Sequence, residues 1–126
     1  MATITITDAG LNLVRNGTKG NSLKITYVAL GTSTTAPTTG DMQLGAEVFR
    51  KAVTSYQDGA TGQEIITLYL GSNDAVGDGI KEVGFYGGNA TDTADSGDLL
   101  ARGLYTHTKA DTESIIFPLT FNVSRA

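Results

Sequence analysis

Three aspartates lie close together in one polar segment of the chain, and they are the first side chains that could bind a ligand. Asp92, Asp95 and Asp98 fall within residues 89–98. Carboxylates in such loops bind calcium when their spacing lets several oxygens converge on the ion. The spacing here is not that of a known calcium-binding loop, and no glutamate closes the segment as a bidentate ligand. We therefore expect these carboxylates to be exposed and no metal to be bound.

The chain has a single histidine, His107, and a nucleophile–base pair of the usual kind would have to use it. It lies at the end of a predicted strand between two threonines, a position typical of a surface residue. Glu64 and Glu82 could act as a general acid and base, but no sequence feature brings them together. The glycine-rich segments lack the spacing and the following helix of a phosphate-binding loop. We therefore expect no catalytic residues, no cofactor and no enzymatic activity.

The five tyrosines all fall in predicted strands. Each has an apolar ring and a polar hydroxyl, so packing at the edge of the core or at an interface is the expected role. A platform that stacks on sugars is the alternative, and it requires several of these rings to share one concave face. The residues concerned are Tyr27, Tyr56, Tyr69, Tyr86 and Tyr105.

Composition restricts the class of protein. The chain has 126 residues, which is the size of one domain over residues 1–126, and it has no cysteine, so no disulfide is expected. The formal net charge is −4 with only 9 lysines and arginines, which argues against a nucleic-acid partner. The first residues show no basic segment followed by an apolar run, so we expect no signal peptide, no membrane insertion and synthesis in the cytoplasm.

Residues 115–124 show the clearest periodicity in the sequence. Apolar side chains occupy every second position, and a period of two predicts a strand with one buried face. We expect Phe117 and Phe121 to belong to the core. Pro118 lacks an N–H group, which predicts that this strand lies at the edge of a sheet.

The remaining elements position these residues. Thr7 or Asp8 caps a short predicted helix over residues 9–15. Between the strands lie polar loops, of which residues 89–98 have the most flexible composition. The pattern predicts a mainly β fold, an antiparallel β-sandwich or a barrel-like domain of about six strands with one short N-terminal helix. The predicted strands cover residues 23–30, 47–57, 64–70, 80–86, 99–107 and 113–124.

Four segments, taken in order, resemble the N-terminal domain of bacteriophage tail-collar and tail-fibre proteins. They are Ile6-Thr7-Asp8-Ala9-Gly10-Leu11, then Leu23-Lys24-Ile25-Thr26-Tyr27-Val28-Ala29-Leu30-Gly31-Thr32 with a Thr/Pro-rich loop after it, then Ile80-Lys81-Glu82-Val83-Gly84-Phe85-Tyr86-Gly87, then Asp98-Leu99-Leu100-Ala101-Arg102. The resemblance covers nearly the whole chain. In fibre proteins this domain anchors the fibre to the virion, and a shaft and tip follow it. Since the sequence stops at Ala126, the resemblance implies an adaptor or baseplate component that carries the anchor alone.

The expected function is therefore a structural component of a phage tail, located in the virion. It would assemble with copies of itself, as a ring or trimer, and bind other tail or baseplate proteins. Two alternatives stay open: a carbohydrate-binding module that recognises a host-surface glycan, and a capsid decoration protein. Loops on a rigid scaffold usually carry recognition, so we expect the interface to include loop residues and the strand around Gly84. The candidate interface residues are Thr34, Pro37, Asn89, Asp92, Asp95, Gly84 and Tyr86.

Overall fold

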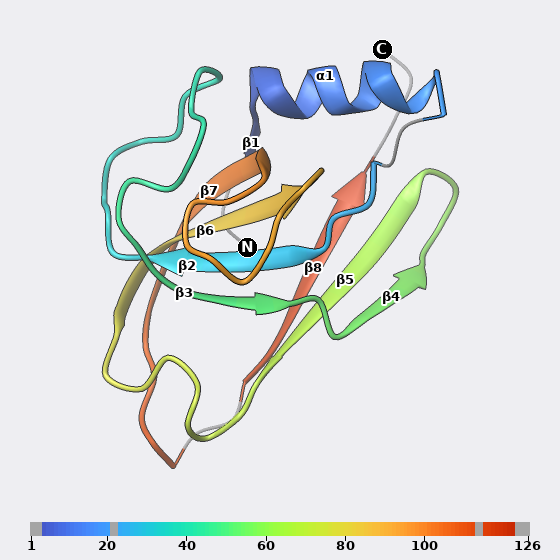
Figure 1. The fold of residues 1–126 in the computed structure, drawn as a ribbon. Helices are drawn as coiled ribbons and strands as arrows, with labels where there is room; N and C mark the ends of the chain where they lie inside the picture. The colour runs from blue at the N-terminus through green and yellow to red at the C-terminus, as the bar shows by residue number, and fades with distance from the viewer. Residues whose placement is uncertain (1–3, 21–22, 113–114, 123–126) are drawn as a thin grey trace.

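The computed structural model describes residues 4–20, 23–112 and 115–122, and it describes side chains for residues 5–20 and 23–112. The described residues form one helix and eight strands (Figure 1). In chain order these are β1 (Ile4–Ile6), α1 (Asp8–Gly17), β2 (Tyr27–Gly31), β3 (Glu47–Ala52), β4 (Ser55–Asp58), β5 (Gln63–Leu70), β6 (Gly79–Gly87), β7 (Asp98–Thr108) and β8 (Ile115–Asn122).

The strands form two antiparallel sheets. The five-stranded sheet has the order β1-β7-β6-β2-β3, and the three-stranded sheet has the order β4-β5-β8. The prediction of a mainly β, antiparallel fold with one short helix is confirmed. Both sheets end in strands with only one described neighbour, so the architecture is sandwich-like and not a closed barrel. The short strand β1, which the sequence did not predict, pairs with β7 at one of these edges.

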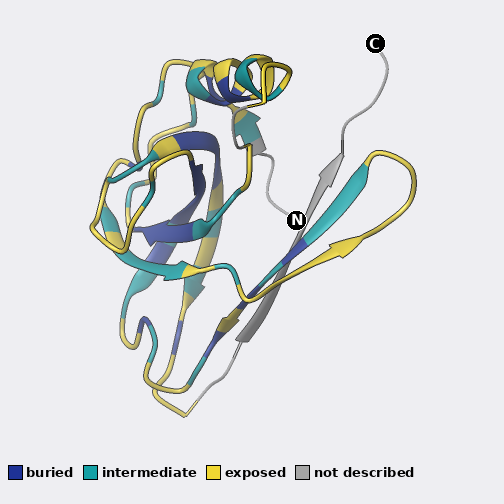
Figure 2. Cartoon of the chain, turned by 45° about the vertical axis from the view of Figure 1, so that its right-hand side comes forward, coloured by how far each residue is buried: buried dark blue, intermediate teal, exposed yellow. Residues whose placement is uncertain are grey.

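The prediction of one continuous strand over residues 47–57 is wrong. The chain leaves the five-stranded sheet after β3 and enters the three-stranded sheet as β4. Two successive amides make the change: Val53 N donates to Thr26 O and Thr54 N donates to Thr67 O, each at 2.9 Å. Beyond this point β4 lies at the outer edge of the three-stranded sheet, and it is exposed along its length (Figure 2).

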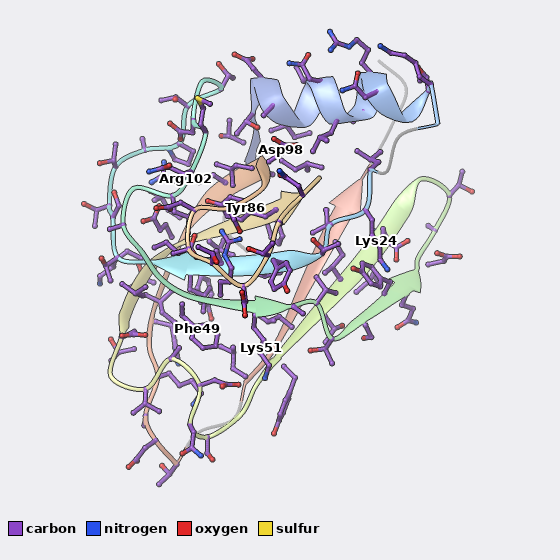
Figure 3. The ribbon with its side chains drawn as sticks, in the orientation of Figure 1. Lys24, Phe49, Lys51, Tyr86, Asp98 and Arg102 are labelled. Atoms are coloured by element: carbon purple, nitrogen blue, oxygen red, sulfur yellow. The ribbon has the colours of Figure 1, made fainter. Side chains whose placement is uncertain are left out.

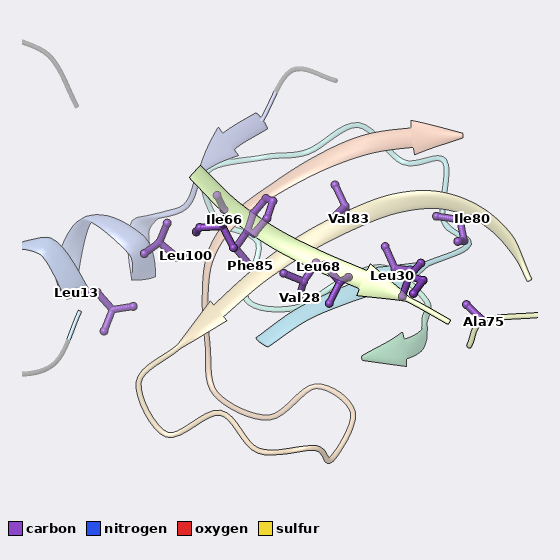
Figure 4. Close-up of a cluster of buried hydrophobic side chains, with 12 residues drawn as sticks. Leu13, Val28, Leu30, Ile66, Leu68, Ala75, Ile80, Val83, Phe85 and Leu100 are labelled. Atoms are coloured by element: carbon purple, nitrogen blue, oxygen red, sulfur yellow. The ribbon is translucent and has the colours of Figure 1, made fainter. Parts of the chain in front are cut away.

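The main core lies between the two sheets (Figure 4). Alternate residues of β5 supply one side of it, and alternate residues of β2 and β6 supply the other, as expected for pleated strands that each present one face to the core. Leu13 of α1 closes one end. The cluster consists of Leu13, Val28, Leu30, Ile66, Leu68, Leu70, Ala75, Ile80, Val83, Phe85, Leu100 and Ala101.

The opposite face of the five-stranded sheet is also covered. A second buried cluster, made of Ala29, Leu44, Tyr86 and Leu99, lies on that side. Leu44 comes from the loop between β2 and β3, and Ala90 of the loop between β6 and β7 packs against the same cluster. Strand β6 is therefore buried on both faces, which explains why Val83 and Phe85 on one side and Tyr86 on the other are all enclosed.

The helix α1 is fixed to strand β7 at its first turn. The Thr7 hydroxyl caps the helix by accepting a hydrogen bond from Gly10 N at 3.0 Å, and it donates to Leu99 O. A Cβ atom on Gly10 would overlap the carbonyl group of Leu100, so only glycine lets the helix approach the strand this closely. The predicted capped helix is confirmed, two residues longer at its C-terminal end than expected.

Strand β8 pairs only with β5 among the described strands, so the predicted edge position of Pro118 is confirmed. The register places Phe117 opposite Leu68, whose own side chain is fully buried. The side chains of Phe117 and Phe121 lie outside the described part, as do residues 113–114 and 123–124 of the predicted strand. Their place in the core stays a prediction.

Candidate functional site

Two long loops lie on the side of the five-stranded sheet that faces away from the three-stranded sheet (Figure 1). One loop spans residues 32–46, and the other spans residues 88–97. Buried charged side chains hold both loops. We call residues 32–46 and 88–98, together with the four anchoring side chains Glu47, Arg50, Glu82 and Arg102, the loop face.

The carboxylate of Glu82, on strand β6, binds the loop of residues 32–46. Its side chain is 0% exposed, in the middle of β6. Oε2 accepts hydrogen bonds from Ser33 N at 3.0 Å and from Ala46 N at 2.9 Å, and Oε1 accepts one from Gly45 N at 2.9 Å. One carboxylate therefore binds backbone amides at both ends of the loop, Ser33 at the first end and Gly45 and Ala46 at the second.

The guanidinium of Arg102 completes this anchor (Figure 3). Its Nε donates to Glu82 Oε1 at 2.9 Å, its Nη1 to Asp41 Oδ2 at 3.0 Å and its Nη2 to Thr35 O at 2.9 Å. Asp41 in turn accepts hydrogen bonds from the amide and hydroxyl of Thr38. All three guanidinium nitrogens are used, so a buried charge network spans the strand and the loop.

The two carboxylates of this network favour their charged forms. Burial acts to raise the pKa of Glu82, but its three backbone N–H donors and Arg102 outweigh burial, and the pKa is lowered. The pKa of Asp41 is also lowered, because the hydrogen bonds from Thr38 and Arg102 outweigh partial burial. Both groups are therefore ionised at neutral pH.

Arg50 of β3 holds the second loop. It forms a two-pronged ion pair with Glu47, with Nε to Oε2 at 2.8 Å and Nη2 to Oε1 at 2.9 Å. Its Nη1 donates to Thr91 O and to Ser96 O, both at 2.9 Å. The guanidinium carbon lies 4.2 Å from the centroid of the Tyr86 ring, which adds a cation–π contact. The flexible composition of residues 89–98 therefore belongs to a loop that is tied down at both ends.

Tyr86 connects the two anchored loops. Its ring lies under Arg50, and its hydroxyl accepts a hydrogen bond from Leu44 N at 3.1 Å. Burial raises the pKa of Tyr86 to about 12, so the hydroxyl stays protonated. Gly84 lies on the same face, and a Cβ there would come within 2.7 Å of a Leu44 methyl. Both residues are buried, so their assignment to an interface is corrected: they support the loops from beneath.

The other five candidate interface residues belong to the two loops of the loop face. Thr34 and Asn89 are exposed, Pro37 is half-buried, and Asp92 and Asp95 are exposed on the second loop. The sequence reasoning missed the four anchors beneath them. A signal was present for two of them, because Glu82 and Arg102 are charged residues that directly adjoin apolar stretches of their strands, and such residues are buried only when they are paired.

The net negative charge of the chain is concentrated on the loop face. Its anchors contribute two carboxylates and two guanidinium groups, and Asp41, Asp92, Asp95 and Asp98 add four further carboxylates. The surplus of four negative charges equals the formal net charge of the whole chain, −4. The rest of the sequence is therefore balanced in charge.

The described residues do not assemble a catalytic site of the kinds considered from sequence. Glu64 lies on the β4–β5 hairpin of the three-stranded sheet, whereas Glu82 is enclosed in the five-stranded sheet. His107 pairs with Ile80 in the β6–β7 ladder, with its ring 6.4 Å from that of Tyr105. Within residues 4–20, 23–112 and 115–122, no group of three histidines or carboxylates could hold a metal ion.

The exposed tyrosines do not form a shared platform in the described structure. Tyr56 is opposite Ile66, on the inner side of the three-stranded sheet, and Tyr69 has the opposite parity on β5. A lysine ammonium lies over each ring, with Lys24 Nζ 5.2 Å from the Tyr56 centroid and Lys51 Nζ 5.7 Å from that of Tyr69. This arrangement gives no support to a sugar-stacking surface.

In the described part of the chain, the helix is too short and too polar to cross a membrane. Comparisons with protein-family models, with curated proteins and with solved structures return no match. The function must therefore be inferred from the loop face itself.

Proposed function

We propose that this chain is a structural, non-enzymatic component of a bacteriophage tail that attaches to neighbouring virion proteins through the loop face. The observation that carries the proposal is the anchoring of two long loops on one face by buried ion pairs, with exposed polar tips. A loop that is already ordered loses little entropy when it binds, so such loops favour recognition.

The segments that resemble tail-collar and tail-fibre proteins support this proposal, because several of their residues hold the loop face in place. Glu82 and Gly84 belong to one of these segments and Arg102 to another, and all three hold or support loop residues. Gly31, near the end of a third segment, lies against the Glu82 carboxylate, and a Cβ atom there would collide with it. Glu82, Gly84 and Arg102 therefore share one structural task, which is to support the loop of residues 32–46.

The test is to locate the chain in virus particles purified from the cells that produce it. We expect mass spectrometry to find the chain in the particles and antibody labelling to place it on the tail. Labelling of the head would instead favour a capsid decoration protein. Absence from particles would refute the proposal.

A matched pair of variants tests the surface. Asp92→Lys reverses a charge on the exposed part of the loop face, and Lys81→Glu reverses one on β6, outside it. Incorporation into particles is expected to fall for the first variant and to stay unchanged for the second. Equal incorporation of both would show that the loop face is not the attachment surface.

A further inference from the structure

We propose that the loop face of one copy binds the outer side of helix α1 of a second copy, so that copies associate head to tail. This inference rests on the proposed use of the loop face for attachment and names its partner. It comes from the charge and the exposed apolar side chains of two surfaces that lie apart on the same chain.

The first observation is where the positive charge is placed. Arg50, Arg102 and Lys109 are enclosed by the fold, and Lys51 pairs with Asp74 at 2.6 Å. A different pair of cations is exposed at the C-terminal end of α1. Arg15 lies in the last turn of the helix and Lys19 just beyond it, and neither forms an ion pair within the described residues. This pair is complementary to the surplus negative charge of the loop face.

The second observation is that both surfaces carry apolar side chains beside their charges. Leu11 and Val14 are 58% and 50% exposed, and they lie one turn apart on the side of α1 that does not contact β7. On the loop face, Met42 is 79% exposed. An apolar centre beside complementary charges is the usual composition of a protein interface, and methionine adapts its shape to its neighbour.

The third observation is geometric. Asp8 N donates to Thr39 O at 2.7 Å, so the first loop lies at the N-terminal end of α1. Arg15 lies about 10 Å further along the axis of this helix, in its last turn, and Lys19 lies beyond its C-terminal end (Figure 1). Within one chain the basic end therefore points away from the loop face. Two different surfaces that bind each other make a heterologous contact, which closes into a ring when the rotation between copies allows it.

The test changes the charges of each surface separately and then mixes the two variants. One variant carries Arg15→Glu and Lys19→Glu, and the other carries Asp92→Lys and Asp95→Asn. Asparagine is used at position 95 because the φ angle there is 64°, which asparagine tolerates. The control is Lys81→Glu, which removes a cation outside both surfaces.

We expect wild-type protein to associate in sedimentation velocity at about 50 mM salt and to dissociate at about 0.5 M salt, since screening weakens exposed charge pairs. Each double variant alone is expected to bind itself at least about tenfold more weakly, and the control is expected to match wild type. An equimolar mixture of the two double variants should regain association, because the unaltered loop face of the first variant can bind the unaltered helix of the second.

The apolar contribution is tested in the same assay. Met42→Ser and Leu11→Ser should each weaken association several-fold, whereas Val76→Ser, a comparably exposed apolar residue outside both surfaces, should not. Circular dichroism of every variant establishes that a lost association is not a lost fold.

A wild-type protein that remains monomeric at about 100 µM and low salt would overturn the head-to-tail contact, because a contact that serves assembly must form in this range. So would a mixture of folded double variants that shows no complex. These outcomes are separate from the proposed function. If the Arg15 and Lys19 variant still enters particles and associates normally, while the Asp92 and Asp95 variant is excluded, the loop face binds another protein and only this inference fails.

Discussion

Replacing Glu82 by glutamine would test whether the buried charge network holds the first loop. Two hydrogen bonds reach each carboxylate oxygen: Ser33 N and Ala46 N donate to Oε2, and Gly45 N and Arg102 Nε donate to Oε1. A glutamine side chain has one acceptor oxygen and one NH₂ group. Whichever way the amide turns, two donors would face another donor.

The magnitude follows from those two lost acceptors. Each buried donor left without a partner costs about 1–3 kcal/mol, so Glu82→Gln is expected to lower the free energy of unfolding by about 3–5 kcal/mol. The loss of the negative charge beside Arg102 acts in the same direction. Urea denaturation followed by circular dichroism measures the change, and amide hydrogen exchange measures the opening of residues 32–46.

The matched control is Glu64→Gln on β5, a half-buried glutamate beside Asp58 and outside the loop anchors, where we expect a change within about 0.5 kcal/mol. Exchange in residues 32–46 should accelerate for Glu82→Gln and stay unchanged for the control. If Glu82→Gln lowers the free energy of unfolding by less than about 1 kcal/mol, the four hydrogen bonds of the carboxylate do not stabilise the loop, and our account of the loop anchor is wrong.

Three further outcomes are expected. The folded-state pKa of Glu82 lies below its ordinary value of 4.5, so its contribution to stability is complete above about pH 5 and is lost as the pH falls through the folded pKa. A urea midpoint that does not decrease when the pH is lowered from about 6 to about 3 would contradict this. Gly84→Ala should cost about 1–3 kcal/mol, since its Cβ would come within 2.7 Å of a leucine methyl, whereas Gly79→Ala, with no atom within 4 Å, should be tolerated; equal melting temperatures would refute the packing argument. Phe117→Ala should cost about 3–5 kcal/mol and Thr120→Ala far less, as the alternation in the last strand predicts; similar losses at both positions would reverse the assigned face.

The sequence was sufficient to predict most of the strands because their periodicity reflects local burial. The prediction over residues 47–57 failed since the change of sheet at Val53 and Thr54 depends on which distant carbonyl each amide meets, Thr26 or Thr67. Strand β1 was missed as an element of the subunit, because a three-residue strand has too few positions to show a period.

The candidate site was predictable in part. The exposed loop residues were recognised from their composition, but the reason for their order was not. Arg50 and Glu47 read as ordinary charged residues of a half-exposed strand, and only the fold shows that Arg50 reaches the carbonyls of Thr91 and Ser96. Gly84 and Tyr86 were misplaced because a close approach to a glycine was expected from a partner, whereas Leu44 of the same chain makes it.

The anchors hold the loops mainly through main-chain atoms. Glu82 accepts from three backbone amides, and Arg102 and Arg50 donate to backbone carbonyl groups. These groups are present whatever side chains the loop carries. The exposed stretch of residues 92–94 can therefore change its sequence with little effect on the fold, whereas Thr91 bonds Thr93 N and Ser96 Oγ through its hydroxyl and Asp95 has a positive φ. Such a chain can acquire a new binding specificity by mutation of its loop tips, and the same property makes it a suitable scaffold for grafting short peptides.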